Sequence, residues 1–337
     1  MSIHARRIAD NLSQPWGKMA GIEQKFATRL NSFRGLGGKG ISPEEAVQAV
    51  AAVPGISAVE LNYPQHFSEG GNHSVLAAAV QSGLEVTAVN LRWDGPDFVL
   101  GAFTHPETAT RRRAIQTACE AVDIAARNNI DHVILWMGPD GYDYPFQVNY
   151  RGIWDREIDG FRQVAARNPA VRVSVEYKPS DPRRTSLIRS MADSLLAVHD
   201  VGLGNFGVTI DFCHALMAGE QPAAAAALAL RAGKLFGVHL NDGYGPADDG
   251  LMVGSVHPWQ TLELLAELRS GGFEGTIYFD TFPDRVDPAR ECAANVETVR
   301  RMLRALERVP AAEFRKAQEG QDAVTATRLM QSLLFND

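Results

Sequence analysis

The most regular feature of the chain is an alternation between two hydrophobic patterns. Short runs of β-branched and aromatic residues, typical of strands, recur at residues 26–33, 58–63, 85–92, 132–137, 171–178, 206–212, 235–241 and 276–282. Longer stretches with apolar residues at helical spacing follow them, at residues 42–53, 74–83, 107–129, 152–168, 186–202, 221–233, 259–272 and 287–306. A strand followed by a helix is the unit from which parallel sheets are built.

Repeated strand–helix units of this number predict a single (β/α)8 TIM barrel. We expect the barrel over residues 26–309, an N-terminal lead over residues 1–25 and a C-terminal helical tail over residues 310–337. The alternative, an open doubly wound sheet, would need a glycine-rich phosphate loop after an early strand. The only candidate, GLGGKG at residues 35–40, lacks the GxGxxG spacing, so the barrel is favoured.

Composition and charge narrow the function classes. The chain has 337 residues, is 45% hydrophobic and carries a formal net charge of −7 without any basic block. Nucleic acid and anionic membranes are therefore poor partners. The three cysteines lie far apart, which excludes a disulfide framework and a CxxC metal site. We see neither an apolar signal segment nor a run of about 18 apolar residues, so a cytoplasmic protein is expected.

Candidate metal ligands lie one on each of the last four predicted strands: Glu176, Asp211, His239 and Asp280. Each stands near the C-terminal end of its strand, and in a parallel barrel those ends converge on the face where active sites are built. Three carboxylates and one neutral imidazole form an oxygen-rich site that suits a divalent cation. We therefore expect Mn²⁺, Mg²⁺ or Co²⁺ as the cofactor, and no organic cofactor.

Structural roles compete with these assignments. Glu176 and Lys178 would form an ion pair at the barrel mouth, Asp211 would cap the following helix, and Asp280 would pair with Arg285 or Arg92. However, the helix after Asp211 is expected to begin only near Gln221. Inward-facing charge at the top of a barrel strand also usually serves function, so the metal-site hypothesis is favoured.

Further residues would extend the site. His214 follows Asp211 at D-x-x-H spacing, and Asp248 and Asp249 precede Gly250 in an acidic loop that either carries a second cation or forms a solvated turn. Lys178 shares the strand face of the first ligand and would contact a substrate oxygen. The expected substrate-binding residues, which supply a wall and polar groups for hydroxyls, are Trp136, Asp140, Gln147, Lys178 and His66.

These motifs resemble those of the xylose-isomerase-like barrels, a family of sugar isomerases, sugar epimerases and endonuclease-IV-type nucleases. The resemblance covers about residues 25–305 and is nearest to the L-rhamnose isomerase branch. It is carried by EYKP at 176–179, DFCH at 211–214, HLND at 239–242, FDTFP at 279–283 and WMGPDGYDYPFQ at 136–147. The nucleases match less well, because they gather histidines around three zincs beside a basic groove.

The resemblance implies roles for the candidate residues. The four strand-end ligands would bind a structural metal ion, His214 and Asp248 a second, catalytic ion, and Lys178 the sugar oxygens. The family usually has a second carboxylate in the acidic loop where this chain has Gly250, and its histidine near the second strand is marked here only by His66.

We therefore expect a divalent-metal-dependent aldose–ketose isomerase that acts on a monosaccharide by hydride shift or through an enediolate, and that forms a homodimer or homotetramer. A ketose 3-epimerase stays open as an alternative. It would place two glutamates astride the sugar, and Glu60 is the only second candidate that faces inward. A C-glycoside-cleaving lyase subunit and a non-catalytic sugar-binding subunit are the remaining alternatives.

Overall fold

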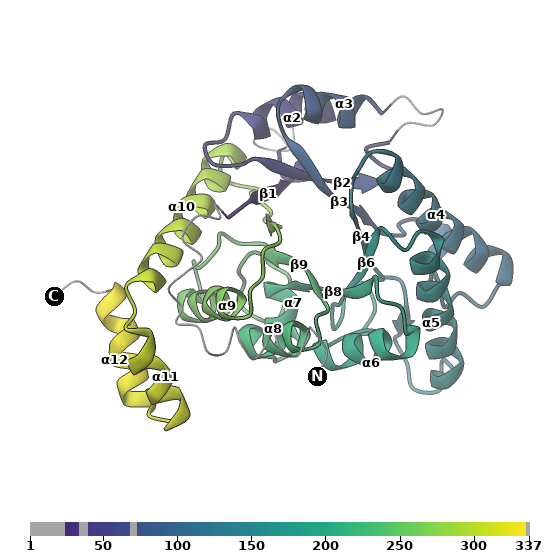
Figure 1. The fold of residues 1–337 in the computed structure, drawn as a ribbon. Helices are drawn as coiled ribbons and strands as arrows, with labels where there is room; N and C mark the ends of the chain where they lie inside the picture. Colours follow the sequence, from purple (N-terminus) through teal and green to yellow (C-terminus); the bar gives the residue numbers. More distant parts are fainter. Residues whose placement is uncertain (1–23, 34–39, 68–72, 335–337) are drawn as a thin grey trace.

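Eight parallel strands close into a barrel, which confirms the predicted fold (Figure 1). They are β1 (Phe26–Arg29), β2 (Ala58–Tyr63), β3 (Glu85–Leu91), β4 (His132–Trp136), β6 (Arg172–Glu176), β8 (Phe206–Asp211), β9 (Leu235–Leu240) and β10 (Ile277–Phe279). The computed structural model describes residues 24–33, 40–67 and 73–334. The predicted N-terminal lead and the GLGGKG loop lie almost entirely outside these described residues.

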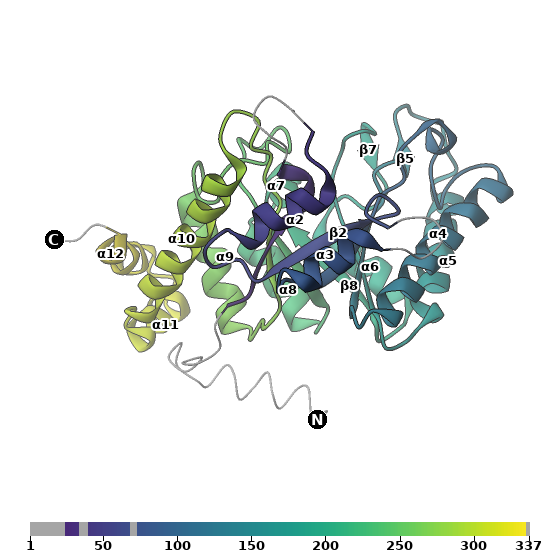
Figure 2. The same cartoon turned by 90° about the horizontal axis from the view of Figure 1, so that it is seen from above.

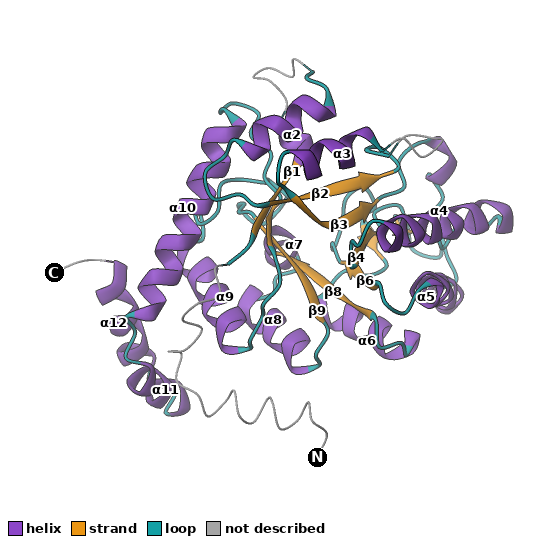
Figure 3. Cartoon of the chain, turned by 45° about the horizontal axis from the view of Figure 1, so that its top comes forward, coloured by secondary structure: helices purple, strands orange, loops and turns teal. Residues whose placement is uncertain are grey.

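Helices surround the barrel on its outside (Figure 3). They are α2 (Pro43–Ala51), α3 (Ser74–Gln81), α4 (Thr108–Arg127), α5 (Tyr150–Arg167), α6 (Met191–Val201), α8 (Pro222–Arg231), α9 (Pro258–Ser270) and α10 (Pro288–Glu307). Local sequence explains where several of them begin. Ser42 and Glu45 form a capping box ahead of Pro43, and Asp287 caps α10 ahead of Pro288.

One helix prediction was wrong at its N-terminal end, and one short helix was not predicted. Helix α6 begins at Met191 rather than at residue 186, because β7 (Thr185–Ser186) pairs with β5 (Gly141–Tyr142) before the Ser190 side chain caps the helix. The segment after β8 is helical at once, since α7 (Phe212–Met217) precedes α8. Figure 2 shows α7, β5 and β7 on the same side of the barrel.

Hydrogen-bonded polar side chains fill the barrel interior below the strand ends. The His132 ring lies 2.8 Å from the Ser174 hydroxyl, which lies 2.7 Å from the Thr209 hydroxyl. Gly237 leaves room for this group, because a Cβ there would lie 2.5 Å from the Thr209 oxygen. His132, Ser174 and Thr209 are thus joined by hydrogen bonds, so this polar layer supports the strand ends above it.

The C-terminal tail is helical, with α11 (Ala311–Glu319) and α12 (Ala323–Leu334). Helix α12 lies against α10, and Arg308 donates a hydrogen bond to the Leu333 carbonyl at 3.3 Å (Figure 2). Among the described residues, no helix has both the length and the apolar character needed to cross a membrane.

Asp140 organises a loop instead of contacting substrate, which corrects the sequence-based expectation. Its side chain is fully buried and accepts hydrogen bonds from the backbone N–H groups of Ala102, Phe103 and Thr104 at 2.8–3.0 Å. The Thr104 hydroxyl donates to it as well. Gly101 is required beside it, because a Cβ there would lie 2.7 Å from the carboxylate.

We predict that Asp140→Ala destabilises the protein strongly. Three buried N–H groups would lose their acceptor, and one such unsatisfied donor alone costs about 1–3 kcal/mol. The free energy of unfolding should be measured by denaturant titration, with the exposed Asp155→Ala on α5 as control, which should change it by less than about 0.5 kcal/mol. Equal stability of the two variants would contradict the structural role of Asp140.

Candidate metal centre

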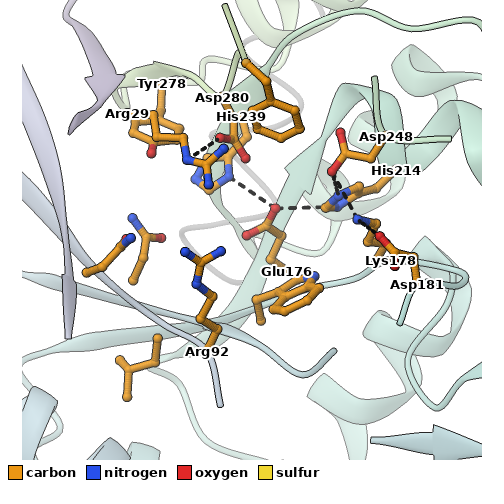
Figure 4. A pocket seen from close by; sticks show the side chains of 15 residues that line it. Arg29, Arg92, Glu176, Lys178, Asp181, His214, His239, Asp248, Tyr278 and Asp280 are labelled. Carbon is orange, nitrogen blue, oxygen red and sulfur yellow. Dashed lines mark hydrogen bonds and ion pairs between the residues drawn. The ribbon is translucent and has the colours of Figure 1, made fainter. Parts of the chain in front are cut away.

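A cavity of about 410 Å³ opens at the C-terminal ends of the strands (Figure 4). This size lies within the range of small-molecule sites. Its wall carries most of the charged side chains singled out above together with several that were not. The lining residues are Arg29, Asn62, Asn90, Leu91, Arg92, Trp136, Glu176, Lys178, Asp181, His214, His239, Asp248, Tyr278, Asp280 and Phe282.

The four strand-end residues, here called the metal group, come together at the base of this cavity. One ligand atom each from Glu176, Asp211, His239 and Asp280 lies within 4.8 Å of the others. Strand register accounts for this, because Asp211 pairs with His239 across β8 and β9, and Asp280 follows directly after β10. The side chains can therefore hold one divalent cation between them.

Asp211 also belongs to a second group, with His214 and Asp248, whose ligand atoms meet the same 4.8 Å limit. The short helix α7 produces this arrangement, since one helical turn carries His214 back over the strand end. Asp211 caps that helix by accepting a 2.9 Å hydrogen bond from the His214 N–H, while Asn241 donates to its other oxygen at 3.0 Å. Asp211 therefore both caps α7 and belongs to the cluster of candidate ligands. In the sequence these roles are alternatives, because the next helix is expected to begin only near Gln221.

Several buried atoms of these groups have no hydrogen-bond partner. They are both ring nitrogens of His239, Nδ1 of His214, Oδ1 of Asp280 and Oδ1 of Asp248. Burying polar atoms without partners costs free energy, and a bound cation would remove that cost. The residues present therefore fit a divalent metal ion.

Without an ion, protons compensate the crowded carboxylates. Burial alone would lower the pKa of His214, but Asp211, Asp248 and Glu176 outweigh it and raise this pKa to about 9. Burial would also lower the pKa of His239, but Glu176 and Glu60 outweigh this effect and raise the pKa well above its usual value. Burial raises the pKa of Asp211 to about 7 against the opposing effect of His214.

Lys178 lies beside the metal group with its charge fully compensated. Its ammonium is 3.1 Å from both Asp248 and Asp181 and lies 5.6 Å from the centre of the Trp136 ring. Burial would lower the pKa of Lys178, yet the two carboxylates raise it above the usual value, so the side chain is cationic. Lys178 and Trp136 both line the cavity, as the sequence predicted.

Two other expected substrate contacts do not reach the cavity. The Gln147 side chain is exposed and accepts hydrogen bonds from the N–H groups of Asp143 and Tyr144, so it closes its own loop. The buried His66 ring accepts from the Asn62 N–H at 2.9 Å and lies 3.1 Å from the Asn31 side-chain oxygen. Asn62 itself is the residue that lines the cavity there.

Sequence reasoning did not assign Arg29, Asn90 or Asp181 to the site. Arg29 is the last residue of β1, and its Nε lies 3.6 Å from Asp280. Period-2 alternation along that strand could have placed it inside, because Ala27 and Arg29 share a face. Asp181 lies in the loop after β6, and no periodic pattern marks such a position.

The acidic loop contributes one carboxylate to the site. Asp249 turns away and accepts a hydrogen bond from the Tyr244 N–H at 2.7 Å. Gly250 has a φ of +57°, and a Cβ there would lie 2.3 Å from the Phe282 ring. An acidic residue at position 250 would therefore meet both backbone strain and a collision.

Glu60 lies behind the metal group and does not line the cavity. It accepts a 2.8 Å hydrogen bond from Asn90, and its carboxylate lies 3.5 Å from the His239 ring. This places Glu60 where it orients a candidate ligand.

Comparison with known proteins shows the family of this barrel. A family model described as xylose isomerase-like TIM barrel matches residues 47–307. A xylose isomerase of Thermus thermophilus is 30% identical over 214 residues, which are 61% of this chain and 55% of that protein. One of Thermus caldophilus is 30% identical over 215 residues, with the same coverage. The chain thus spans about half the length of these curated relatives.

Several solved structures share the fold of this chain, at lower sequence identity than the two xylose isomerases. A xylose isomerase domain protein from Alicyclobacillus acidocaldarius is 19% identical with a TM-score of 0.64, covering 85% of this chain and 99% of that one. A D-tagatose 3-epimerase-like protein is 18% identical with a TM-score of 0.66, covering 84% and 98%. The 3-keto-D-glucoside 4-epimerase of E. coli is 18% identical with a TM-score of 0.62, covering 82% and 99%.

The finer resemblance to the L-rhamnose isomerase branch stays a prediction. The family model, in contrast, spans well over half of the sequence and nearly all of the barrel. The chain therefore belongs to the xylose isomerase-like TIM barrel family.

Proposed function

We propose that this protein is a divalent-metal-dependent aldose–ketose isomerase that acts on a monosaccharide. The observation that supports this most is the pairing of a metal-binding group with a buried ammonium. Glu176 and Lys178 leave the same end of β6, and both face the cavity (Figure 4). The cytoplasmic location and the homo-oligomeric state stay predictions.

The metal group would act on the substrate carbonyl. A bound Mn²⁺, Mg²⁺ or Co²⁺ would supply Lewis-acid polarisation of that carbonyl. Glu176, Asp211, His239 and Asp280 would hold it, and His214 with Asp248 are proposed to hold a second ion. Asp211 offers a ligand atom to both groups.

Lys178 is proposed to stabilise negative charge that develops on a substrate oxygen. Asp248 and Asp181 hold its ammonium in place, and its position is therefore fixed before substrate arrives. Such prearranged charge is usually a large contributor to catalysis. The Trp136 ring beside it would exclude water from that side of the cavity.

A ketose 3-epimerase is the second candidate, because epimerases share this fold. The position of Glu60 disfavours it. Among the residues that line the cavity, Glu176 is the only glutamate, whereas Glu60 is engaged with Asn90 and His239 behind the wall. The lyase and the non-catalytic subunit remain alternatives that the same assay separates.

The assay is interconversion of a panel of pentoses and hexoses by protein that has been stripped of metal and reloaded with Mn²⁺. Products should be identified by NMR, which separates aldose–ketose pairs from C3 epimers. We expect aldose–ketose exchange that disappears on chelation. C3 epimers alone would favour the epimerase, and no sugar conversion with stoichiometric metal bound would overturn the isomerase proposal.

We predict that Glu176→Gln loses metal, activity and thermal stability together. An ion that binds only the folded protein stabilises it by about 3–4 kcal/mol at a hundred to a thousand times its dissociation constant. Metal content and melting temperature should be measured with and without chelator. Glu85→Gln, on an exposed residue at the N-terminal end of β3, should behave like the wild type. Full metal content in Glu176→Gln would reject its role as a ligand.

We predict that Lys178→Met keeps its metal but loses turnover. Removing one prearranged charge donor typically costs about 10²–10³-fold in kcat. Turnover should be measured beside the metal content, with Lys25→Met as the control, because Lys25 pairs with Glu85 far from the cavity. The isomerase assignment weakens, and the epimerase gains, if Lys178→Met turns over at a nearly normal rate.

We predict that metal affinity rises with pH up to about 9, the raised pKa of His214, because the ion must displace that proton. The stability of the metal-free protein should change in the opposite direction. A histidine whose pKa is raised on folding stabilises the folded protein fully below its unfolded pKa of about 6.5. This stabilisation disappears as the pH rises through the pKa of the folded state. Calorimetric titration with Mn²⁺ in buffers of different ionisation enthalpy measures the released protons. Binding without proton release would contradict the assignment.

A further inference from the structure

Two arginines face the side of the cavity that lies away from Lys178. Arg29 ends β1 and Arg92 follows β3, and both line the cavity. Figure 4 shows their side chains on the other side of Glu176 from the Lys178 ammonium. The proposed metal-dependent reaction uses neither of them.

The positive charge on this side is only partly compensated. The Arg29 Nε is 3.6 Å from Asp280, and its guanidinium lies 4.6 Å from the centre of the Phe282 ring. The Arg92 Nε is 3.1 Å from Asp94, whose side chain is 72% exposed and does not line the cavity. Neither guanidinium makes a well-aligned hydrogen bond to any residue that the structure describes, so the terminal nitrogens of Arg92 remain available.

The cavity carboxylates do not compete for Arg92. Asp248 and Asp181 are held by Lys178, Asp280 by Arg29, and Glu176 by the two histidines. A neutral sugar does not require an arginine here, because Asn62 and Asn90 line the same part of the cavity and bind hydroxyls well. An arginine with free donors instead matches a carboxylate or a phosphate, which it can bind through two parallel hydrogen bonds.

We infer that the substrate is an anionic monosaccharide, with a carboxylate or phosphate group that Arg92 binds directly and Arg29 attracts. This inference rests on the proposed function, since it takes the cavity to be a sugar site. The anionic group would lie on the side of the cavity away from Lys178 (Figure 4). Arg92 would thus be a specificity-determining residue.

The test compares three open-chain probes that differ in charge: D-glucitol, D-gluconate and D-glucitol 6-phosphate. Each should be titrated calorimetrically into Mn²⁺-loaded protein at constant ionic strength. We expect at least one anionic probe to bind ten or more times more tightly than D-glucitol. The carboxylate and the phosphate arms then distinguish a sugar acid from a sugar phosphate.

Arg92→Gln should reduce this preference to less than twofold and leave the affinity for D-glucitol unchanged. The matched control is Arg113→Gln on α4, since Arg113 also has a single exposed carboxylate partner, Asp97, but does not line the cavity. Arg92→Lys, which keeps the charge and loses the planar fork, should retain an intermediate preference. Melting temperatures of all variants verify that they are folded.

Two results would overturn the inference. One is wild-type protein that binds D-glucitol as tightly as both anionic probes. The other is an anionic preference that survives Arg92→Gln, as it would if a probe carboxylate bound the metal ion itself. Because these are binding measurements, they are independent of turnover. If the protein prefers anionic probes but does not exchange aldoses and ketoses, only the isomerase proposal is rejected. If it exchanges them but shows no anionic preference, only the anionic substrate is rejected.

Discussion

The arrangement of the site depends on one constraint, the burial of several ionisable groups where parallel strands end. Glu176, Asp211, His239 and Asp280 come from four neighbouring strands, and closure of the barrel brings their side chains together. Their unpartnered atoms need either protons or a cation. The raised pKa values and the fit to a divalent ion are therefore two consequences of the same geometry. A barrel in which these strand ends were apolar would need neither.

Features that depend on local sequence patterns were predictable, and features that depend on contacts between distant loops were not. Strand patterns located all eight barrel strands, because β-branched runs and barrel closure reinforce each other. The strand ends also indicated that the four candidate ligands lie close together, as they do in the structure. Loop positions were predicted poorly: Asp140, Gln147 and His66 bond to backbone N–H groups that only the folded loops bring close. A polar residue in a loop looks the same in sequence whether it faces substrate or its own main chain.

The acidic loop illustrates why a departure from a family pattern must be read with its neighbours. In the sequence, Gly250 stands where the family usually has a second carboxylate. In the structure its positive φ and its contact with Phe282 make it a requirement of the loop. The same turn directs Asp248 toward His214 and Lys178. The chain thus keeps one carboxylate in place at the cost of the second, and any second ion would depend on fewer protein oxygens than the first.

The two sides of the cavity divide its electrostatic work. On one side Lys178 is saturated by carboxylates, so its charge is fixed in position and little of it extends outward. On the other side Arg92 has only an exposed partner and keeps donors directed at the cavity. A fixed charge near the metal group suits stabilisation of charge that appears during reaction. An uncommitted charge suits recognition of charge that the substrate already carries. Reaction and substrate recognition would then be separable by mutation, because Lys178 follows β6 whereas Arg92 follows β3.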